Sequence, residues 1–369
     1  FSPDGQYAVV ANEGEPNDDY SNDPEGSITV IDVSGGFDAP VAATADFNAF
    51  NVGGSKSLTG PVRISAKAES VAQDIEPEFI AFSGDASTAF ATLQENNAVA
   101  VIDLADAEVD AVLGIGFKDY GIPGNEIDAS NKDGGVNFNS WSIYGTYMPD
   151  GFDAYDVNGI TYLVTANEGD GREYVSDAAD AADCTAQGGF LFDDGDCFHY
   201  LDEIRVKDLD ASQFTDELVA KLGADFQDQD KFGRLKIITD LGLEDTAACT
   251  NIKKSGQPIA YPDETPVAGC VYEDLYSFGS RSFTIWDTTT GRPVFDSGSD
   301  FERITAQRLG ASFNASNDSN DGDDRSDDKG PEPEAVEIAT IEGTTFAFIA
   351  LERVGGIMVY NITNPQNAE

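Results

Sequence analysis

Acidic side chains recur at fixed places in a repeating β pattern of this sequence. Four predicted strands each end in a glutamate, and these are Glu13, Glu95, Glu168 and Glu352. Three further acids each follow a proline at the start of a predicted strand, namely Glu78, Asp150 and Glu334. The start of one strand lies beside the end of its antiparallel partner. We therefore expect both sets of acids to meet at one rim of the fold.

Carboxylates gathered in this number cannot all ionise freely, and they must be protonated, paired or bound to metal. Calcium is the predicted ion, because it takes about six to eight oxygen ligands. The amides of Asn12, Gln94 and Asn167 adjoin three of the glutamates and offer carbonyl oxygens. A single histidine and four cysteines argue against zinc, copper or haem. The alternative is that the acids only cap strands or accept backbone hydrogen bonds.

Three cations are expected to face these acids. The segment that starts at Leu275 resembles the four strands that end in glutamate, but it ends in Arg281. Two more basic residues, Arg325 and Lys329, lie shortly before Glu334. A guanidinium beside a metal is typical of sites that hold phosphate or a carboxylate. We therefore predict Arg281, Arg325 and Lys329 as anion-binding or catalytic residues. A structural salt bridge is the alternative for Arg281.

The elements that must position these residues are short strands in repeated units. Residues 75–103 show the unit most clearly, as three antiparallel strands with a turn at residues 84–87. Repeated four-stranded units of this size are typical of β-propeller blades. We predict an all-β fold, with residues 1–369 as a single propeller domain of five blades. The predicted blades are residues 1–60, 77–117, 147–243, 270–300 and 333–362.

The first predicted blade lacks its opening strand and the last lacks its closing strand. The chain also begins inside a predicted turn, at Phe1-Ser-Pro-Asp-Gly. We interpret the sequence as a fragment of a longer secreted precursor, whose intact propeller has seven blades.

Long insertions are expected on the same face as the acids. They include residues 118–146, 244–269 and 301–332, which precede first strands. Function is commonly carried by loops on such a scaffold. The low-complexity stretch Asn314 to Asp328 is interpreted either as a solvated loop or as part of the site. Two acidic groups resemble weak calcium loops without matching an EF-hand; they are Asp18, Asp19, Asp23, Asp321, Asp323 and Asp324.

Composition narrows the partners and the compartment. The chain has 21 Lys and Arg against 68 Asp and Glu, a net charge of -47. This charge argues against nucleic acid or an anionic membrane and suits divalent cations or a salty medium. No apolar run is long enough for a transmembrane helix. The cysteines fall in two close pairs, 184 with 197 and 249 with 270, which predicts two local disulfides and a secreted or cell-surface location.

Five segments resemble the choice-of-anchor I domain family; they are residues 11–20, 166–174, 276–287, 323–334 and 350–362. That family comprises propellers of secreted or surface-anchored bacterial proteins, related to the mesenchyme-specific cell-surface glycoprotein of sea urchins. Some members are labelled alkaline phosphatase, and a distant similarity to PhoX-type and phytase-like propellers implies a calcium-dependent phosphoesterase. This similarity implies that the four strand-end glutamates are metal ligands. It also implies that Arg281 and Arg325 bind the phosphate group. The cysteine that PhoX-type enzymes use with iron has no match here.

Three hypotheses follow. The first is an extracellular calcium-binding propeller whose acid-lined channel mouth binds metal and a phosphorylated ligand. The second is a calcium-dependent phosphomonoesterase of PhoX-like type. The third is a structural subunit of a surface layer, a filament or a mineralising matrix, as the sea-urchin relative implies, in contact with other cell-surface or matrix components.

Overall fold

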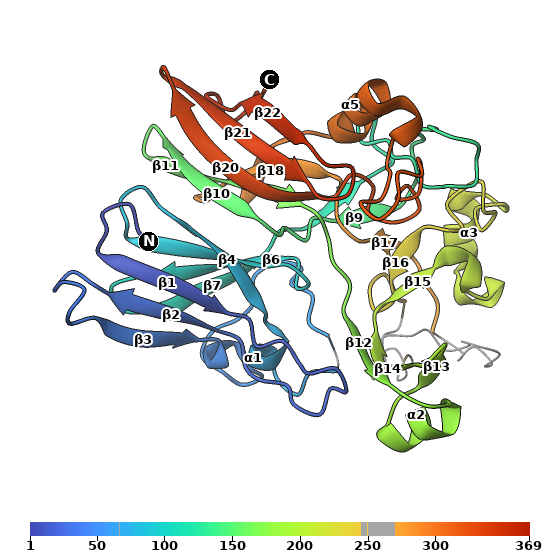
Figure 1. The fold of residues 1–369 in the computed structure, drawn as a ribbon, viewed down its shortest axis with the longest axis horizontal. Helices are drawn as coiled ribbons and strands as arrows, with labels where there is room; N and C mark the ends of the chain where they lie inside the picture. Colours follow the sequence, from blue (N-terminus) through green and yellow to red (C-terminus); the bar gives the residue numbers. More distant parts are fainter. Residues whose placement is uncertain (66, 245–248, 250–269) are drawn as a thin grey trace.

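The fold is all-β, with 22 strands, few helices and almost entirely antiparallel pairing (Figure 1). It is seen in a computed structural model that describes residues 1–65, 67–244, 249 and 270–369. Four blade-like sheets, here called sheets I to IV, occupy one part of the molecule. A large insertion between two strands of sheet III occupies the other part (Figure 1).

Sheets I and II come from the N-terminal third of the chain. Sheet I contains β1 (Tyr7–Asn12), β2 (Ser27–Asp32) and β3 (Val41–Asp46). Sheet II contains β4 (Pro77–Phe82), β5 (Thr88–Leu93), β6 (Ala98–Asp103) and β7 (Glu108–Gly114), in that order. The short helix α1 (Val71–Asp74) leads into β4. Sheet II is therefore a four-stranded antiparallel meander of the kind that forms a propeller blade.

Sheets III and IV complete the blade-like part. Sheet III contains β10 (Phe152–Val157), β11 (Ile160–Asn167), β18 (Ser282–Asp287) and β19 (Arg292–Asp296). Sheet IV contains β20 (Pro333–Ile341), β21 (Thr344–Leu351) and β22 (Ile357–Asn361). Asn158-Gly159 and Glu342-Gly343 join the first two strands of each sheet, and both residues of each pair have positive φ. This is the backbone that a two-residue hairpin requires.

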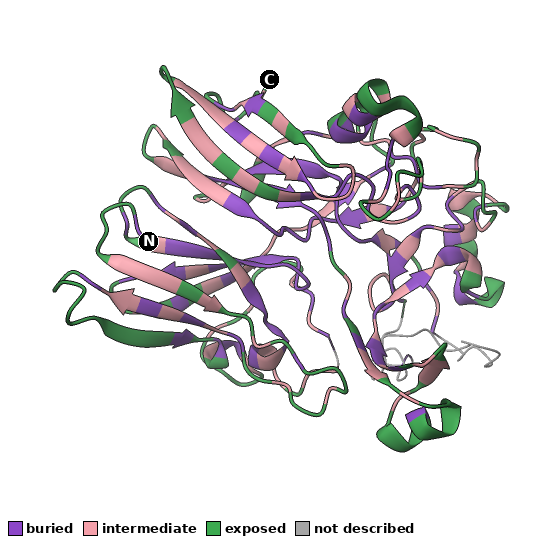
Figure 2. Ribbon diagram, in the orientation of Figure 1, coloured by how far each residue is buried: buried purple, intermediate pink, exposed green. Residues whose placement is uncertain are grey.

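The four sheets follow one another in an arc. Strand β4 lies against β1 on one side and β10 on the other, and β10 lies against β20. The arc does not close into a ring in Figure 1. Apolar side chains fill the space between successive sheets, and between II and III they include Phe90, Leu163 and Trp286. The outer strand β3 is exposed along most of its length (Figure 2).

The prediction of five blades is wrong, because two of them form one sheet. Strand β11 pairs with β18, so predicted blades 147–243 and 270–300 supply two strands each to sheet III. The segments around Asp208 and 234–239 lie within the predicted third blade, but they contribute β15 (Glu203–Arg205) and β16 (Lys236–Ile238) to another sheet. Strand β18 is buried on both faces except at its last residue. A strand buried on both faces needs apolar side chains such as Phe283 and Trp286 of β18. The segment around Asp208 carries Arg205 and Lys207 and is therefore less suited to this position.

The insertion has its own sheet and core. Its five strands run in the order β15, β16, β17 (Tyr276–Ser277), β9 (Tyr144–Thr146) and β8 (Phe117–Asp119). Strands β8 and β9 come from the connection between sheets II and III, so two insertions share one sheet. The core beneath includes Tyr120, Phe232 and Tyr272, and the helix α3 (Asp216–Leu222) packs onto it through Leu218.

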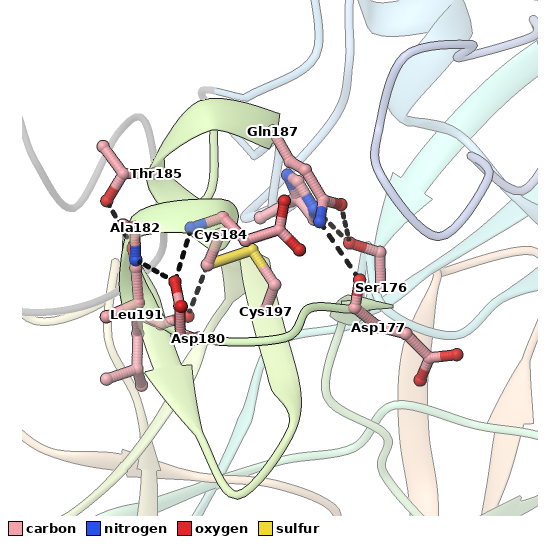
Figure 3. Close-up of a disulfide and its surroundings, with 12 residues drawn as sticks. Ser176, Asp177, Asp180, Ala182, Cys184, Thr185, Gln187, Leu191 and Cys197 are labelled. Carbon is pink, nitrogen blue, oxygen red and sulfur yellow. Dashed lines mark hydrogen bonds between the residues drawn. A yellow bond between two sulfur atoms is a disulfide. The ribbon is translucent and has the colours of Figure 1, made fainter.

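Both predicted disulfides are present, linking Cys184 to Cys197 and Cys249 to Cys270. The first joins α2 (Ala181–Gln187) to a small sheet of β12 (Glu173–Asp177), β13 (Leu191–Asp193) and β14 (Asp196–Leu201), as Figure 3 shows. Asp180 caps α2 by accepting hydrogen bonds from the backbone amides of Ala182 and Asp183. In the described residues, no helix is long and apolar enough to cross a membrane.

The pairing of β11 with β18 predicts that Trp286 is a major stabilising residue. Trp286 is 4% exposed, packs between sheets II and III, and donates to Thr165 Oγ1 at 2.9 Å. Trp286→Ala should lower the free energy of unfolding by about 3–5 kcal/mol in urea denaturation. The control is Phe37→Ala, since Phe37 is 77% exposed. Equal stability of the two variants would contradict this packing.

Candidate metal and anion site

The seven predicted acids converge at one rim. The four strand-end glutamates follow β1, β5, β11 and β21, while the other three acids lie at or just before the starts of β4, β10 and β20. Glu78 interacts electrostatically with Glu95, Asp150 and Glu13. Asp150 in turn interacts with Glu168 and Glu334, and Glu352 interacts with Glu334.

A polar cavity of about 340 Å³, here called the acidic pocket, opens at this rim. It is lined by Glu13, Glu15, Glu76, Glu95, Asp170, Gly171, Arg172, Glu173 and Tyr174. Its walls come from sheets I and II and from the start of the insertion after β11. Glu13, Glu95 and Asp170 come shortly after the ends of blade strands, and Glu76 directly precedes the start of β4.

Glu95 is the acid of this pocket that has an unpartnered oxygen. Its side chain is buried, at 9% exposure for the residue, and its Oε2 atom has no hydrogen-bond partner among the described residues. An isolated buried carboxylate oxygen is costly unless a proton, a hydrogen bond or a cation satisfies it. The neighbouring Gln94 does not supply one, because its Nε2 donates to Glu168 Oε2 at 3.0 Å.

Burial and mutual repulsion raise the pKa values of these acids. Burial is the largest cause of the rise for Glu78, whose pKa reaches about 11, and Glu95, Asp150 and Glu13 add to it. The pKa of Asp150 rises to about 7 through burial, followed by repulsion from Glu168 and Glu334. Burial and the nearby Glu76 also raise the pKa of Glu95. A bound cation would favour the ionised forms and reverse these shifts.

Lys329 provides the positive charge on the other side of the rim. Its Nζ lies 2.8 Å from Glu168 Oε1, 3.3 Å from Asp170 Oδ1 and 3.3 Å from Glu332 Oε2. Glu168, Glu332 and Glu352 form the one group of three acids among the described residues whose ligand atoms lie within 4.8 Å of one another. The Lys329 ammonium already neutralises part of that group. We therefore place the stronger candidate for a metal at Glu95.

Arg325 and Lys329 line a second cavity of about 220 Å³, here called the mixed-charge pocket. It shares residues 170–173 with the acidic pocket, so the two cavities adjoin. The other basic residues of its lining are Arg172, Lys236 and Arg353. Each has acidic partners: Arg325 Nε lies 2.7 Å from Glu332 Oε1, and Arg353 Nε lies 3.1 Å from Glu332 Oε2.

Arg281 lines neither pocket. It is 2% exposed; its Nη1 donates to Glu302 Oε1 at 2.7 Å and to the Asp128 carbonyl at 2.6 Å. Its Nη2 donates to the carbonyls of Ser326 and Asp328. The segment ending at Arg281 leads into β18 rather than closing a second strand, which explains why it lacks the glutamate. The antiparallel pairing of Asn167 with Ser282 places the Arg281 backbone opposite Glu168, while its side chain forms the salt bridge to Glu302. The anion-binding or catalytic role of Arg281 stays a prediction.

The predicted amide ligands also have other roles. Asn12 Nδ2 donates to Ser27 and Thr29 on the neighbouring strand β2. Asn167 Oδ1 accepts from Thr165 Oγ1, and its Nδ2 donates to Thr284 on β18. These two amides join adjacent strands.

Several residues of the site were missed in the sequence. Glu76 accepts from Arg172 and from the Tyr174 hydroxyl, and Glu332 pairs with three cations. A signal existed for both, because Glu-Pro-Glu occurs twice, at residues 76–78 and 332–334. No comparable pattern marks Arg172, which also binds Asp74 Oδ1 at 3.2 Å.

Removal of the Lys329 charge should destabilise the protein in a pH-dependent way. Lys329→Met leaves Glu168 and Glu332 less compensated and should cost about 3–5 kcal/mol. The Lys329 ammonium lowers the pKa of Glu168 against the effect of burial. Without it the folded state holds the Glu168 proton more tightly than the unfolded state does, so the deficit should grow from pH 5 to pH 8.

Urea denaturation of this variant at both pH values provides the measurement. Lys221→Met is the control, since the Lys221–Asp274 pair is exposed and should change stability by less than about 1 kcal/mol. A deficit that is equal at the two pH values would contradict the role given to Lys329.

Comparison with known proteins adds to this geometry. Gigasin-3a of Magallana gigas is 33% identical over 98 residues, which are 25% of this chain and 34% of Gigasin-3a. The chain thus spans about a third of that relative. The crystal structure of the Myceliophteria_thermophila Cps50 (Swd1) β-propeller domain aligns over 97% of this chain and 76% of its own, with 8% identity and a TM-score of 0.19. At that score the alignment carries no argument.

A family model gives the broad assignment. The model described as choice-of-anchor I domain matches residues 1–365. The match includes all four blade-like sheets, both disulfides and every acid of the rim. The chain therefore belongs to the choice-of-anchor I domain family.

Proposed function

We propose that this chain is an extracellular or cell-surface calcium-binding domain. The observation that carries the proposal is Glu95, a nine-tenths buried glutamate whose Oε2 lacks a partner among the described residues. The ion would be held in the acidic pocket by Glu95 and Glu13, with Glu78 and Asp150 next to it. Glu168, Glu334 and Glu352 continue the rim and would tune the affinity by their charge.

The donor set supports calcium over softer metals. Every candidate ligand is a carboxylate oxygen, which suits Ca²⁺ rather than zinc or copper. The four cysteines form the two disulfides, and no free cysteine is present. Arg172 and Lys329 offset part of the negative charge. The raised pKa values of Glu78 and Glu95 indicate that this compensation is incomplete without a further cation.

The proposed location rests on the disulfides and on the family. Disulfides persist in oxidising compartments, and the chain has two. The net charge of -47 also suits a divalent-cation-rich surface environment.

A second candidate is a phosphorylated ligand in the mixed-charge pocket, which would make a calcium-dependent phosphoesterase possible. The observation in its favour is that five basic side chains line this cavity, directly beside the acidic pocket. Such an anion would compete with the acids that now pair with Arg325, Lys329 and Arg353. Binding of that ligand should therefore depend on calcium in the adjoining pocket.

Calorimetric titration tests the calcium proposal. The wild-type protein should bind Ca²⁺, and Glu95→Gln should weaken binding at the acidic pocket by at least about tenfold, since it removes a charged ligand. Glu217→Gln is the matched control, because Glu217 is exposed on α3. Equal calcium binding by wild type and Glu95→Gln would remove the acidic pocket from consideration.

The pKa shift of Asp150 predicts a pH effect on stability. Its pKa is raised to about 7, so the metal-free folded state holds its proton more tightly than the unfolded state. The stability that this carboxyl contributes is present below about pH 4 and is lost as the pH rises to about 7. Asn mimics the protonated acid, so wild type should lose stability relative to Asp150→Asn by up to about 1.4 kcal/mol per pH unit in that window.

Thermal melts from pH 4 to pH 8 with a calcium chelator provide the measurement. Saturating Ca²⁺ should reverse the trend, because a cation next to Asp150 favours its ionised form. A difference between the two proteins that does not change with pH would contradict the placement of Asp150 in a crowded acid site.

A further inference from the structure

A second group of acids lies outside both pockets. It is formed by Asp128, Glu302, Asn314 and Asp323, here called the loop cluster. Asp128 belongs to the connection between β8 and β9, Glu302 to the helix α5 (Asp300–Leu309), and the other two to the segment that joins α5 to β20. Asp128 and Asn314 are fully buried, and Glu302 is 1% exposed.

Two oxygens in this cluster have no hydrogen-bond partner among the described residues. They are Glu302 Oε2 and Asn314 Oδ1. Their side chains are bonded to each other, since Asn314 Nδ2 donates to Glu302 Oε1 at 3.1 Å. The same Nδ2 donates to Ser326 Oγ at 2.9 Å, and Ser326 Oγ donates to Asp323 Oδ1 at 2.6 Å. One short network therefore contains both unpartnered oxygens and the Asp323 carboxylate.

The cluster carries more negative than positive charge. Asp128 interacts electrostatically with Asp323, Asp133 and Glu302. Arg281 is the cation that contacts the cluster, and it binds Glu302 through Oε1 and Asp128 through its carbonyl. Among the described residues, that guanidinium donates no hydrogen bond to Glu302 Oε2 or to the Asp128 carboxylate. The Asp128 carboxylate accepts instead from the backbone amide of Asn137 at 2.7 Å.

We propose that the loop cluster binds a second hard divalent cation, Ca²⁺, through Glu302 Oε2 and Asn314 Oδ1, with the negative charges of Asp128 and Asp323 beside them. Mixed carboxylate and amide oxygens are the ligands that calcium prefers. Two unpartnered oxygens in a buried position are otherwise left with their full desolvation cost.

This site would act on the rim through the chain. The segment that holds Asn314 and Asp323 continues directly into Lys329 and Glu332. Arg281, which binds Glu302 of the loop cluster, also donates from Nη2 to the backbone carbonyls of Ser326 and Asp328 in this segment. A cation in the loop cluster therefore fixes the segment that delivers Lys329 to Glu168. The loop cluster does not depend on the acidic pocket holding calcium.

Calcium calorimetry of matched variants tests the proposal. Asp323→Asn should weaken one class of site by at least about tenfold and leave the class that Glu95→Gln removes. Asp321→Asn is the control, because Asp321 is an exposed acid of the same loop. If Asp323→Asn and Asp321→Asn both bind as wild type does, the loop cluster is not a calcium site. If Glu95→Gln binds calcium as wild type does and Asp323→Asn loses one class of site, the acidic pocket fails and the loop cluster stands.

Limited trypsin digestion gives a second readout that does not depend on the Asp323 variant folding. In the Glu95→Gln protein, Ca²⁺ at about ten times its Kd for the loop cluster should slow cleavage after Arg325 by roughly tenfold, because binding stabilises the closed loop. Cleavage at the same rate with Ca²⁺ and with a chelator would overturn the proposal.

Discussion

Buried carboxylates that repel one another are the constraint on which this molecule depends. In each blade-like sheet one strand is directly followed by a glutamate or reaches it within two residues, so β1, β5, β11 and β21 bring four glutamates to one rim. The acids that begin the first strands add to them. Glu95 shows the consequence most clearly, since it is buried without a partner for Oε2 among the described residues. Proteins tolerate such a group where a proton or a cation satisfies it.

The insertion between β11 and β18 of sheet III supplies part of the positive charge that these acids need. It begins directly after Glu168 and brings Arg172 across to Asp74 and Glu76. The segment before β20 brings Lys329 to Glu168 from the opposite direction. Both segments are long because they must leave the sheets, reach over the rim and return. The loops thus position the compensating charges, and the sheets position the acids.

Local patterns in the sequence predicted the acids well. Alternating strands and short turns locate Glu13, Glu95, Glu168 and Glu352, because strand ends depend on neighbouring residues only. Pairing across the insertion was not predictable in the same way. The segments around Asp208 and Asp287 have similar patterns, and only the packing of Trp286 between sheets II and III distinguishes them. The partners of the Arg281 side chain, Glu302 and the carbonyls of Ser326 and Asp328, were equally hidden in the sequence.

The partners of the acids were the least visible in the sequence. Arg172 and Glu332 meet their partners through long-range packing that no spacing rule encodes, although the repeated Glu-Pro-Glu pattern could have indicated Glu332. The loop cluster is a similar case. The sequence marks Asp323 as part of an acidic loop, whereas Glu302 lies on a helix and Asp128 on a distant connection. Their convergence is a property of the fold.

The most direct measurement is a crystal structure grown in Ca²⁺, with anomalous scattering used to locate the ion. Our account predicts an anomalous peak in the acidic pocket, at about 2.3–2.6 Å from carboxylate oxygens that include Glu95. A featureless acidic pocket at saturating calcium, with Glu95 hydrogen-bonded to another protein group, would contradict it.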